Sequence, residues 1–115
     1  MKNSIHKLQS LIAVGWLLPV LSASCSSALA AASGEDTFKA KCAMCHGQDG
    51  SGNTPMGKRT KLRDLRSAEV QKETDDDLAS TIKNGKSPMP AYGKTLSAKE
   101  IQDLVAYIRS IAKKS

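Results

Sequence analysis

Two cysteines and a histidine carry the clearest chemistry in this sequence. Cys42 and Cys45 are separated by two residues and His46 follows directly, which gives the pattern C-x-x-C-H. Near a helix end, two thiols at this spacing can add to the two vinyl groups of one porphyrin, and the next residue can offer its imidazole to the iron. The motif therefore predicts one haem c, bound covalently through Cys42 and Cys45, with His46 as an axial ligand.

Three other uses of this motif compete with haem. A structural zinc site needs about four protein ligands, and residues 31–115 contain only Cys42, Cys45 and His46 as ligands of that kind. A redox-active dithiol is compatible with any C-x-x-C, but it belongs with a βαβ pattern that this sequence lacks. A plain disulfide would leave His46 without a role. Haem uses all three residues, and we adopt it as the prediction.

The second axial ligand is predicted by elimination among the soft side chains. Within residues 31–115 there is no histidine besides His46, so a methionine must take the other position. Met44 lies between the two cysteines and cannot reach the opposite face, while Met56 follows His46 too closely and is assigned to packing. Met89 lies far along the chain between two prolines, which hold it in an extended segment. Met89 is therefore the predicted second ligand of the iron.

The N-terminal segment has the features of a secretory signal peptide. Two lysines precede an apolar run over 11–21, and small residues follow up to an Ala-x-Ala site at 28–30. The run is shorter than the roughly 20 apolar residues that a membrane-spanning helix needs. The sequence thus predicts a signal peptide over 1–30 and a domain over 31–115 that is exported to the periplasm.

Cys25 allows a different interpretation of the same segment. A lipoprotein signal also ends before a cysteine, which then becomes acylated, but such signals usually have Leu three residues earlier. Here that position is Ser22. We therefore expect Cys25 to be removed with the signal, and a lipid anchor at Cys25 is the alternative.

The composition beyond the signal describes one small, weakly basic domain. Residues 31–115 contain 15 Lys and Arg against 11 Asp and Glu, a net charge of +4, which does not favour a nucleic-acid partner. Three aromatic residues remain in this range, so the apolar core is thin for a domain of this size. A haem would supply the large apolar body that such a core lacks.

Helical patterns account for most of the remaining sequence. The last helix is the clearest, because Ser97 and Glu100 form a capping box and apolar residues then recur at helical spacing. No strand-like alternation is present, so the predicted fold is all-α. The predicted helices cover residues 35–45, 67–73, 74–84 and 97–112.

The region after the motif is predicted to be a loop and then a basic run. Four glycines and a proline over 47–57 indicate a loop that wraps an edge of the haem. The Pro55 carbonyl is the first candidate to accept a hydrogen bond from the ring of His46, and a simple turn proline is the alternative. Residues 58–66 are mostly basic and are interpreted as a solvated face. Two alternatives stay open, pairing of Arg63 or a neighbour with a haem propionate and docking of an acidic partner.

With these motifs in order, the sequence resembles the small soluble bacterial monohaem cytochromes c with His/Met ligation, of the class I type. The resemblance rests on four segments: Gly34-x-x-x-Phe38, Cys42-Ala43-Met44-Cys45-His46-Gly47, Met89-Pro90 and Leu104-Val105-Ala106-Tyr107-Ile108-Arg109. It implies that the first and last helices cross, with Gly34 and Phe38 near Tyr107. It also implies that short helices and loops wrap one covalent haem.

The function predicted from these features is electron transfer rather than catalysis. A periplasmic monomer would shuttle single electrons between redox partner proteins, without catalytic residues, a nucleic-acid partner or a transmembrane segment. One alternative is a gas-binding sensor or weak peroxidase whose iron keeps an open sixth position. Another is a haem subunit tethered to a larger respiratory enzyme.

Overall fold

The structure is a computed structural model that describes residues 25–114. The charged and apolar parts of the predicted signal, within residues 1–24, lie outside the described residues. The described chain forms helices and connecting loops, and its one β feature is an isolated bridge between Lys86 and Met89. The helices in chain order are α1 (Cys25–Lys41), α2 (Ala43–His46), α3 (Pro55–Thr60), α4 (Ala68–Gln71), α5 (Asp75–Asn84) and α6 (Ala98–Ser110). The prediction of an all-α fold is confirmed.

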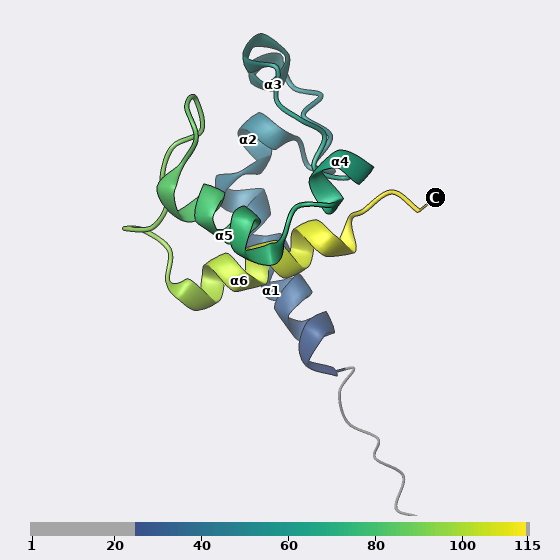
Figure 1. Cartoon of the computed structure of the whole chain (residues 1–115), viewed down its shortest axis with the longest axis vertical. Coiled ribbons are helices and arrows are strands. Elements are labelled where there is room, and N and C mark those ends of the chain that lie inside the picture. Colours follow the sequence, from purple (N-terminus) through teal and green to yellow (C-terminus); the bar gives the residue numbers. More distant parts are fainter. Residues whose placement is uncertain (1–24, 115) are drawn as a thin grey trace, which may run out of the picture.

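The two long helices α1 and α6 pack across each other at the centre of the domain (Figure 1). A Cβ atom at Gly34 of α1 would lie 2.0 Å from the backbone oxygen of Asp103 in α6, so only glycine permits this approach. Beside it, the rings of Phe38 and Tyr107 lie with their centroids 5.0 Å apart, within the range of favourable aromatic pairs. The crossing that the family resemblance implied is therefore present.

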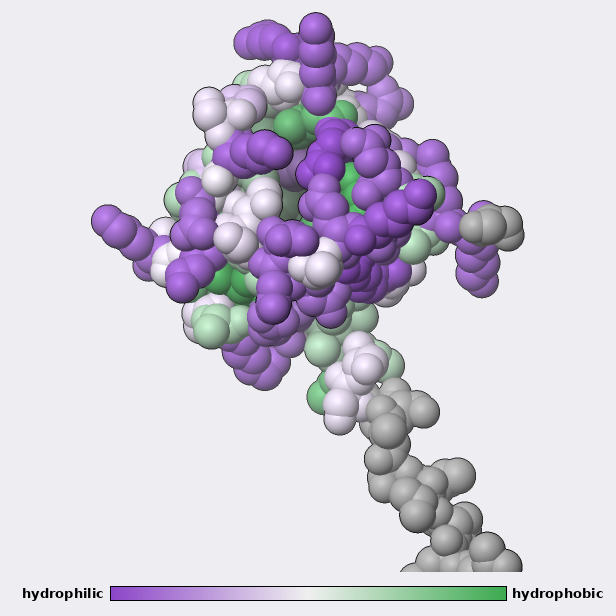
Figure 2. Space-filling model, viewed as in Figure 1, coloured by the Kyte–Doolittle hydropathy of each residue, from purple (hydrophilic) through white to green (hydrophobic). Residues whose placement is uncertain are grey.

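A compact apolar core surrounds this crossing. Phe38, Val70, Leu104 and Val105 are its largest fully buried side chains, and α5 adds Leu78 and Ile82 to it. On the face drawn in Figure 2, hydrophilic residues dominate and hydrophobic ones show only in small patches between them. Among residues 25–114, no helix is both long and apolar enough to cross a membrane.

Side-chain caps and one arginine fix the short helices against α6. Thr74 and Ser97 each begin a helix, α5 and α6, with a complete capping box, which satisfies backbone N–H groups that have no partner within the helix. Arg109 of α6 donates to the backbone carbonyls of Gln71 and Glu73 and to the carboxylate of Asp75. The turn between α4 and α5 is thereby held on α6.

The first predicted helix differs from the observed one at both ends. The prediction placed it over 35–45, whereas α1 covers Cys25–Lys41 and a separate short helix, α2, follows. The alanine-rich stretch before residue 35 has high helix propensity, which extends α1 toward the N-terminus. At the other end the backbone N–H of Cys45 bonds to the Cys42 carbonyl at 3.1 Å. This tighter turn breaks the helix inside the motif.

The loop predicted over 47–57 is also shorter than expected. Helix α3 begins at Pro55, where proline suits the first helical position. Thr54 caps it by accepting the N–H of Gly57 at 2.8 Å. Glycines between His46 and Thr54 adopt positive φ values, and this part of the prediction, a tight irregular loop, holds.

Candidate haem site

The motif residues sit on a short turn that the following loop holds in place. Cys42 lies at the break between α1 and α2, and Cys45 and His46 form the last turn of α2. The His46 N–H bonds to the Cys42 carbonyl at 2.9 Å, and Gly52 donates its N–H to the His46 carbonyl at 2.6 Å. Thr54 donates its hydroxyl to the Cys45 carbonyl at 2.7 Å. The backbone on both sides of the imidazole is therefore fixed by the loop rather than by a continuous helix.

The two thiols are free and half-buried. Burial is the main cause that raises the pKa of the Cys42 thiol to about 11, and its neighbour Cys45 adds to the effect. A redox-active dithiol needs a lowered thiol pKa, so this environment disfavours that use of the motif. Across residues 25–114, no three His, Cys, Asp or Glu side chains gather as a metal-ion site would require. A closed zinc site therefore lacks its ligand set in the described chain.

The imidazole of His46 is held in a form that can bind iron. Burial lowers its pKa, which favours the neutral ring that serves as a metal ligand. Its Nδ1 atom is buried and has no hydrogen-bond partner in the described part of the chain. The His46 ring thus makes no hydrogen bond to the Pro55 carbonyl through this atom, and of the two interpretations of Pro55 the structural one holds, since Pro55 begins α3. A buried ring nitrogen without a protein partner fits a side chain that a bound group must complete.

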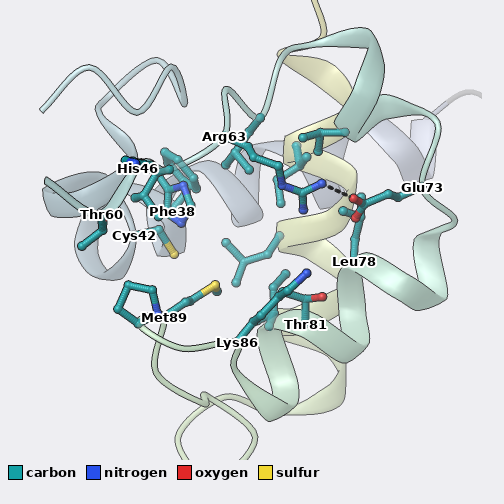
Figure 3. Close-up of a pocket in the computed structure, with 18 of the residues that line it drawn as sticks. Phe38, Cys42, His46, Thr60, Arg63, Glu73, Leu78, Thr81, Lys86 and Met89 are labelled. Carbon is teal, nitrogen blue, oxygen red and sulfur yellow. Dashed lines mark hydrogen bonds and ion pairs between the residues drawn. The ribbon is translucent and has the colours of Figure 1, made fainter. Parts of the chain in front are cut away.

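Met89 reaches the same space from a distant part of the chain. It lies in the loop after α5, where its N–H bonds to the Lys86 carbonyl at 2.8 Å and its carbonyl accepts the Lys86 N–H at 3.1 Å. Figure 3 shows the Met89 side chain pointing into the space that Cys42 and His46 also border. The structure thus brings together side chains that are far apart in the sequence.

Two adjoining cavities, of about 210 and 180 Å³, separate these side chains. Cys42, His46 and Met89 line both cavities, and Cys45 lines the second. The walls of the first cavity are mostly apolar, as expected for a bound macrocycle. Besides Met89, these apolar wall residues are Phe38, Leu62, Leu65, Val70, Leu78, Ile82, Pro88, Leu104 and Ile108. The donor set and the apolar walls both fit a haem.

Comparisons with known proteins identify the family and the fold of the chain. A model of the family described as "Cytochrome C oxidase, cbb3-type, subunit III" matches residues 29–108. Cytochrome c6 of Pyropia tenera is 36% identical over 81 residues, which cover 70% of this chain and 92% of that protein. The Cbb3-type cytochrome c oxidase subunit FixP of Azorhizobium caulinodans is 35% identical over 83 residues, which cover 71% of this chain and 27% of that protein. A solved structure, the KustC0563 c-type cytochrome, has a TM-score of 0.65 and 29% identity, covering 70% of this chain and 98% of that one.

The chain belongs to the monohaem cytochrome c family. The family implies a covalently bound haem c and redox partners for the carrier. Its homologues, the cytochromes c6, are electron carriers and not enzymes, so the prediction of an electron carrier rather than an enzyme is confirmed at the level of the family. The solved structure confirms the cytochrome c fold.

The other two methionines considered for this cytochrome lie in different surroundings. Met44 is 84% exposed and lines neither cavity, as its place between the cysteines predicts. Met56 lies in α3, is 41% exposed and lines only the second cavity. Met56 is therefore only partly the packing residue that the sequence predicted, because much of its surface is exposed to solvent.

The basic run over 58–66 divides into a paired and an unpaired half. Arg63 lies on the cavity wall and forms an ion pair with Glu73 (Figure 3). Arg66 binds Asp64 at 2.9 Å through its Nε atom. The three earlier cations have no carboxylate at ion-pair distance within residues 25–114, and Lys61 also lines the first cavity. These unpaired cations are Lys58, Arg59 and Lys61.

One contact at the site has no counterpart in the sequence-based predictions. The hydroxyl of Tyr92 donates to the backbone carbonyl of Lys41 at 3.2 Å, and its ring lines the second cavity. In the sequence, Tyr92 is one of few aromatic residues and follows closely after Met89. A hydrogen bond to a backbone carbonyl leaves no side-chain pattern at Lys41, so the sequence held no signal for it.

Proposed function

We propose that this cytochrome is an exported electron-transfer protein of the periplasm, with one haem c attached through Cys42 and Cys45. His46 and Met89 are its axial ligands in this proposal. The observation that supports it most directly is that Cys42, His46 and Met89 line the same two cavities. Membership of the cytochrome c family supports the same ligand chemistry.

The residues of the site have distinct tasks in this function. A bound haem supplies a one-electron Fe(III)/Fe(II) couple. Thioether bonds from Cys42 and Cys45 prevent loss of the cofactor outside the cytoplasm. His46 and Met89 are neutral ligands, and His/Met ligation raises the reduction potential. With His46 and Met89 holding the haem in both oxidation states, the chain would need little rearrangement when an electron is transferred.

The apolar walls contribute to the same end. Phe38, Leu104 and Ile108 line the first cavity and are almost fully buried. An apolar surrounding keeps water away from the metal and disfavours the extra positive charge of the oxidised form. The walls should therefore add to the effect of Met89 and favour the reduced state.

Export of the chain is the second part of this proposal. Cleavage after Ala30 would shorten α1 but would leave Gly34 and Phe38, and with them the crossing with α6. A lipid on Cys25 is the alternative fate of the N-terminal segment. The mass of the protein purified from a periplasmic expression host separates the two, because a chain that starts near Ala31 lacks Cys25.

A tethered haem subunit is the second candidate, favoured by one observation. The matching family model carries the description of a subunit of the cbb3-type oxidase, and FixP contains a homologous stretch. That stretch is only 27% of FixP, so the likeness concerns the haem domain. Recovery of the haem protein from the soluble periplasmic fraction supports a shuttle, and recovery only with membranes supports the tethered subunit.

The ligand assignment is tested by visible spectra of the matured protein beside the variants Met89→Ala and Met56→Ala. We expect a low-spin spectrum with a weak long-wavelength Met–iron band in the wild type. Met89→Ala should lose the band, and Met56→Ala should keep it. A wild type that is high-spin or binds CO readily would overturn the His/Met carrier and favour a gas-binding sensor or peroxidase.

A further inference from the structure

The helix break inside the motif leaves a backbone carbonyl that needs a partner. In a continuous helix, the Lys41 carbonyl would accept the N–H of Cys45. Here that N–H bonds to the Cys42 carbonyl instead, at 3.1 Å. The hydroxyl of Tyr92 donates to the Lys41 carbonyl at 3.2 Å. A residue of the Met89 loop thus completes the end of the helix that precedes Cys42.

Apart from this bond, residues 86–93 make hydrogen bonds to α5, to each other and, through the Tyr92 carbonyl, to Thr95 and Leu96. Tyr92 donates its N–H to the Ile82 carbonyl at 3.0 Å, and Gly93 donates to the Lys83 carbonyl at 2.9 Å. The Lys86–Met89 bridge closes the tip of the loop. Among the described residues, the bond from Tyr92 is the one hydrogen bond between residues 86–93 and the attachment segment 41–46.

Tyr92 also stands next to the space between the two predicted ligands. Its ring lines the second cavity together with Cys42, Cys45, His46 and Met89. Its side chain therefore contributes an apolar wall with the ring and a tether with the hydroxyl. Both contributions act on the distance between the Met89 loop and the motif.

We propose that Tyr92 is a positioning residue that ties the Met89 loop to the attachment segment and so keeps Met89 on the iron. This inference rests on the proposed function, since it requires Met89 to be a ligand. Without the hydroxyl, the loop would keep its bonds to α5 but lose its bond to the motif. The state in which Met89 has left the iron would then be more populated, and an added ligand would bind that state more readily.

The test uses Tyr92→Phe, which removes one oxygen atom and keeps the ring. Tyr107→Phe is the matched control, because the Tyr107 hydroxyl has no hydrogen-bond partner among the described residues and Tyr107 lines neither cavity. Imidazole is titrated into the oxidised haem-loaded proteins, and loss of the Met–iron band is followed. Tyr92→Phe should bind imidazole about two- to tenfold more tightly than the wild type, the range that one lost hydrogen bond gives.

The control should stay within about twofold of the wild type, since removing a hydroxyl without a partner breaks no bond. Tightening of less than twofold in Tyr92→Phe, or equal tightening in both variants, overturns the role of Tyr92. A wild type without a Met–iron band overturns the proposed ligation instead, so the two failures are distinguishable. Thermal unfolding of both variants shows whether a change in imidazole binding merely follows a general loss of stability.

Discussion

The crossing of α1 and α6 and the loop that carries Met89 are held together in different ways. At the crossing, Gly34 lets the helices touch and Phe38 packs against Tyr107, so the contact is made by buried apolar surface. The Met89 loop is held by backbone hydrogen bonds to α5 and by the hydroxyl of Tyr92, while its Met89 and Tyr92 side chains are only partly buried against the core. Buried packing resists local opening, whereas a segment held by a few exposed hydrogen bonds opens at low free energy. The scaffold and the ligand loop should therefore respond differently to mutation.

The largest loss of stability is expected from Gly34→Ala. The new Cβ would lie 2.0 Å from the Asp103 oxygen, so α1 and α6 must move apart. We expect the free energy of unfolding to fall by about 3 kcal/mol, as for other overpacked core positions. Helix propensity alone would instead make alanine about 1 kcal/mol more stable than glycine. Thermal unfolding of the haem-loaded protein measures the change.

Ser33→Ala is the control for this variant, since Ser33 is an exposed neighbour on the same helix. It should change the free energy of unfolding by less than about 0.5 kcal/mol. If Gly34→Ala were as stable as Ser33→Ala, the close approach of the two helices would not exist in solution.

Gly85→Ala tests the ligand loop. We expect it to lower the free energy of unfolding less than Gly34→Ala does, and to weaken the binding of Met89 to the iron more. Gly85 has a φ of 73°, and a Cβ there would lie 2.8 Å from the Met89 oxygen. Strain of this kind costs about 1–2 kcal/mol. Part of it can be relieved if the loop moves, so imidazole should displace Met89 more easily than in Gly34→Ala. The reverse order of imidazole affinities would contradict the division between scaffold and loop.

The same division explains which features the sequence allowed us to predict. The crossing depends on residue type and spacing, since a glycine, a phenylalanine and a tyrosine must meet there, and these are visible in the sequence. The motif and Met89 are equally visible, because few other soft ligands exist in the chain. The break at Cys42 and the tether from Tyr92 depend on which backbone carbonyl is left without a partner. Side-chain pattern does not encode that choice, so the sequence left the Pro55 hydrogen bond and a simple turn proline both open, and it gave no sign of the Lys41 bond.

Asp64→Asn alters the scaffold rather than the ligand loop. We expect it to have an intermediate effect on the free energy of unfolding. Asp64 accepts hydrogen bonds from Arg66 and forms an ion pair with Lys113. The hydrogen bond from Arg66 is the main cause that holds the pKa of Asp64 well below its usual value of 3.8. The asparagine variant should lose about 1–2 kcal/mol near neutral pH, as for hydrogen bonds to a charged group. Imidazole affinity should not change, because Asp64 lines neither cavity.

The pH dependence of this loss has a defined sign. A depressed carboxylate pKa stabilises the folded state fully above the unfolded pKa, near 3.8, and this contribution is lost as the pH falls further. The difference in unfolding free energy between wild type and Asp64→Asn should thus be constant above about pH 5 and shrink below about pH 4. Urea unfolding at pH 3 and pH 7 measures it, and a difference that grows in acid would contradict the assigned cause.

We expect the smallest effect, on the rate of oxidation, from the unpaired cations of residues 58–66. Lys58 and Arg59 lie in α3 and have no carboxylate partner among residues 25–114, while α3 itself contributes Met56 and Thr60 to the second cavity. Positive charge beside the cavity should attract an anionic oxidant such as ferricyanide. We expect the double variant Lys58→Glu, Arg59→Glu to slow the oxidation of the reduced protein by about two- to fivefold at low salt, with little difference at 1 M salt, where charges are screened beyond about 3 Å.

Lys72→Glu, Lys83→Glu is the matched control, since these two lysines line neither cavity and the net charge changes by the same amount. If the α3 variant slows oxidation more than the control variant does, charge acts locally at the cavity, on the side where the attachment turn and its loop lie. Equal slowing in both variants would mean that only the net charge of the protein matters. In that case residues 58–66 would be a solvated face and not a docking surface, which is the simpler of the interpretations that their sequence allows.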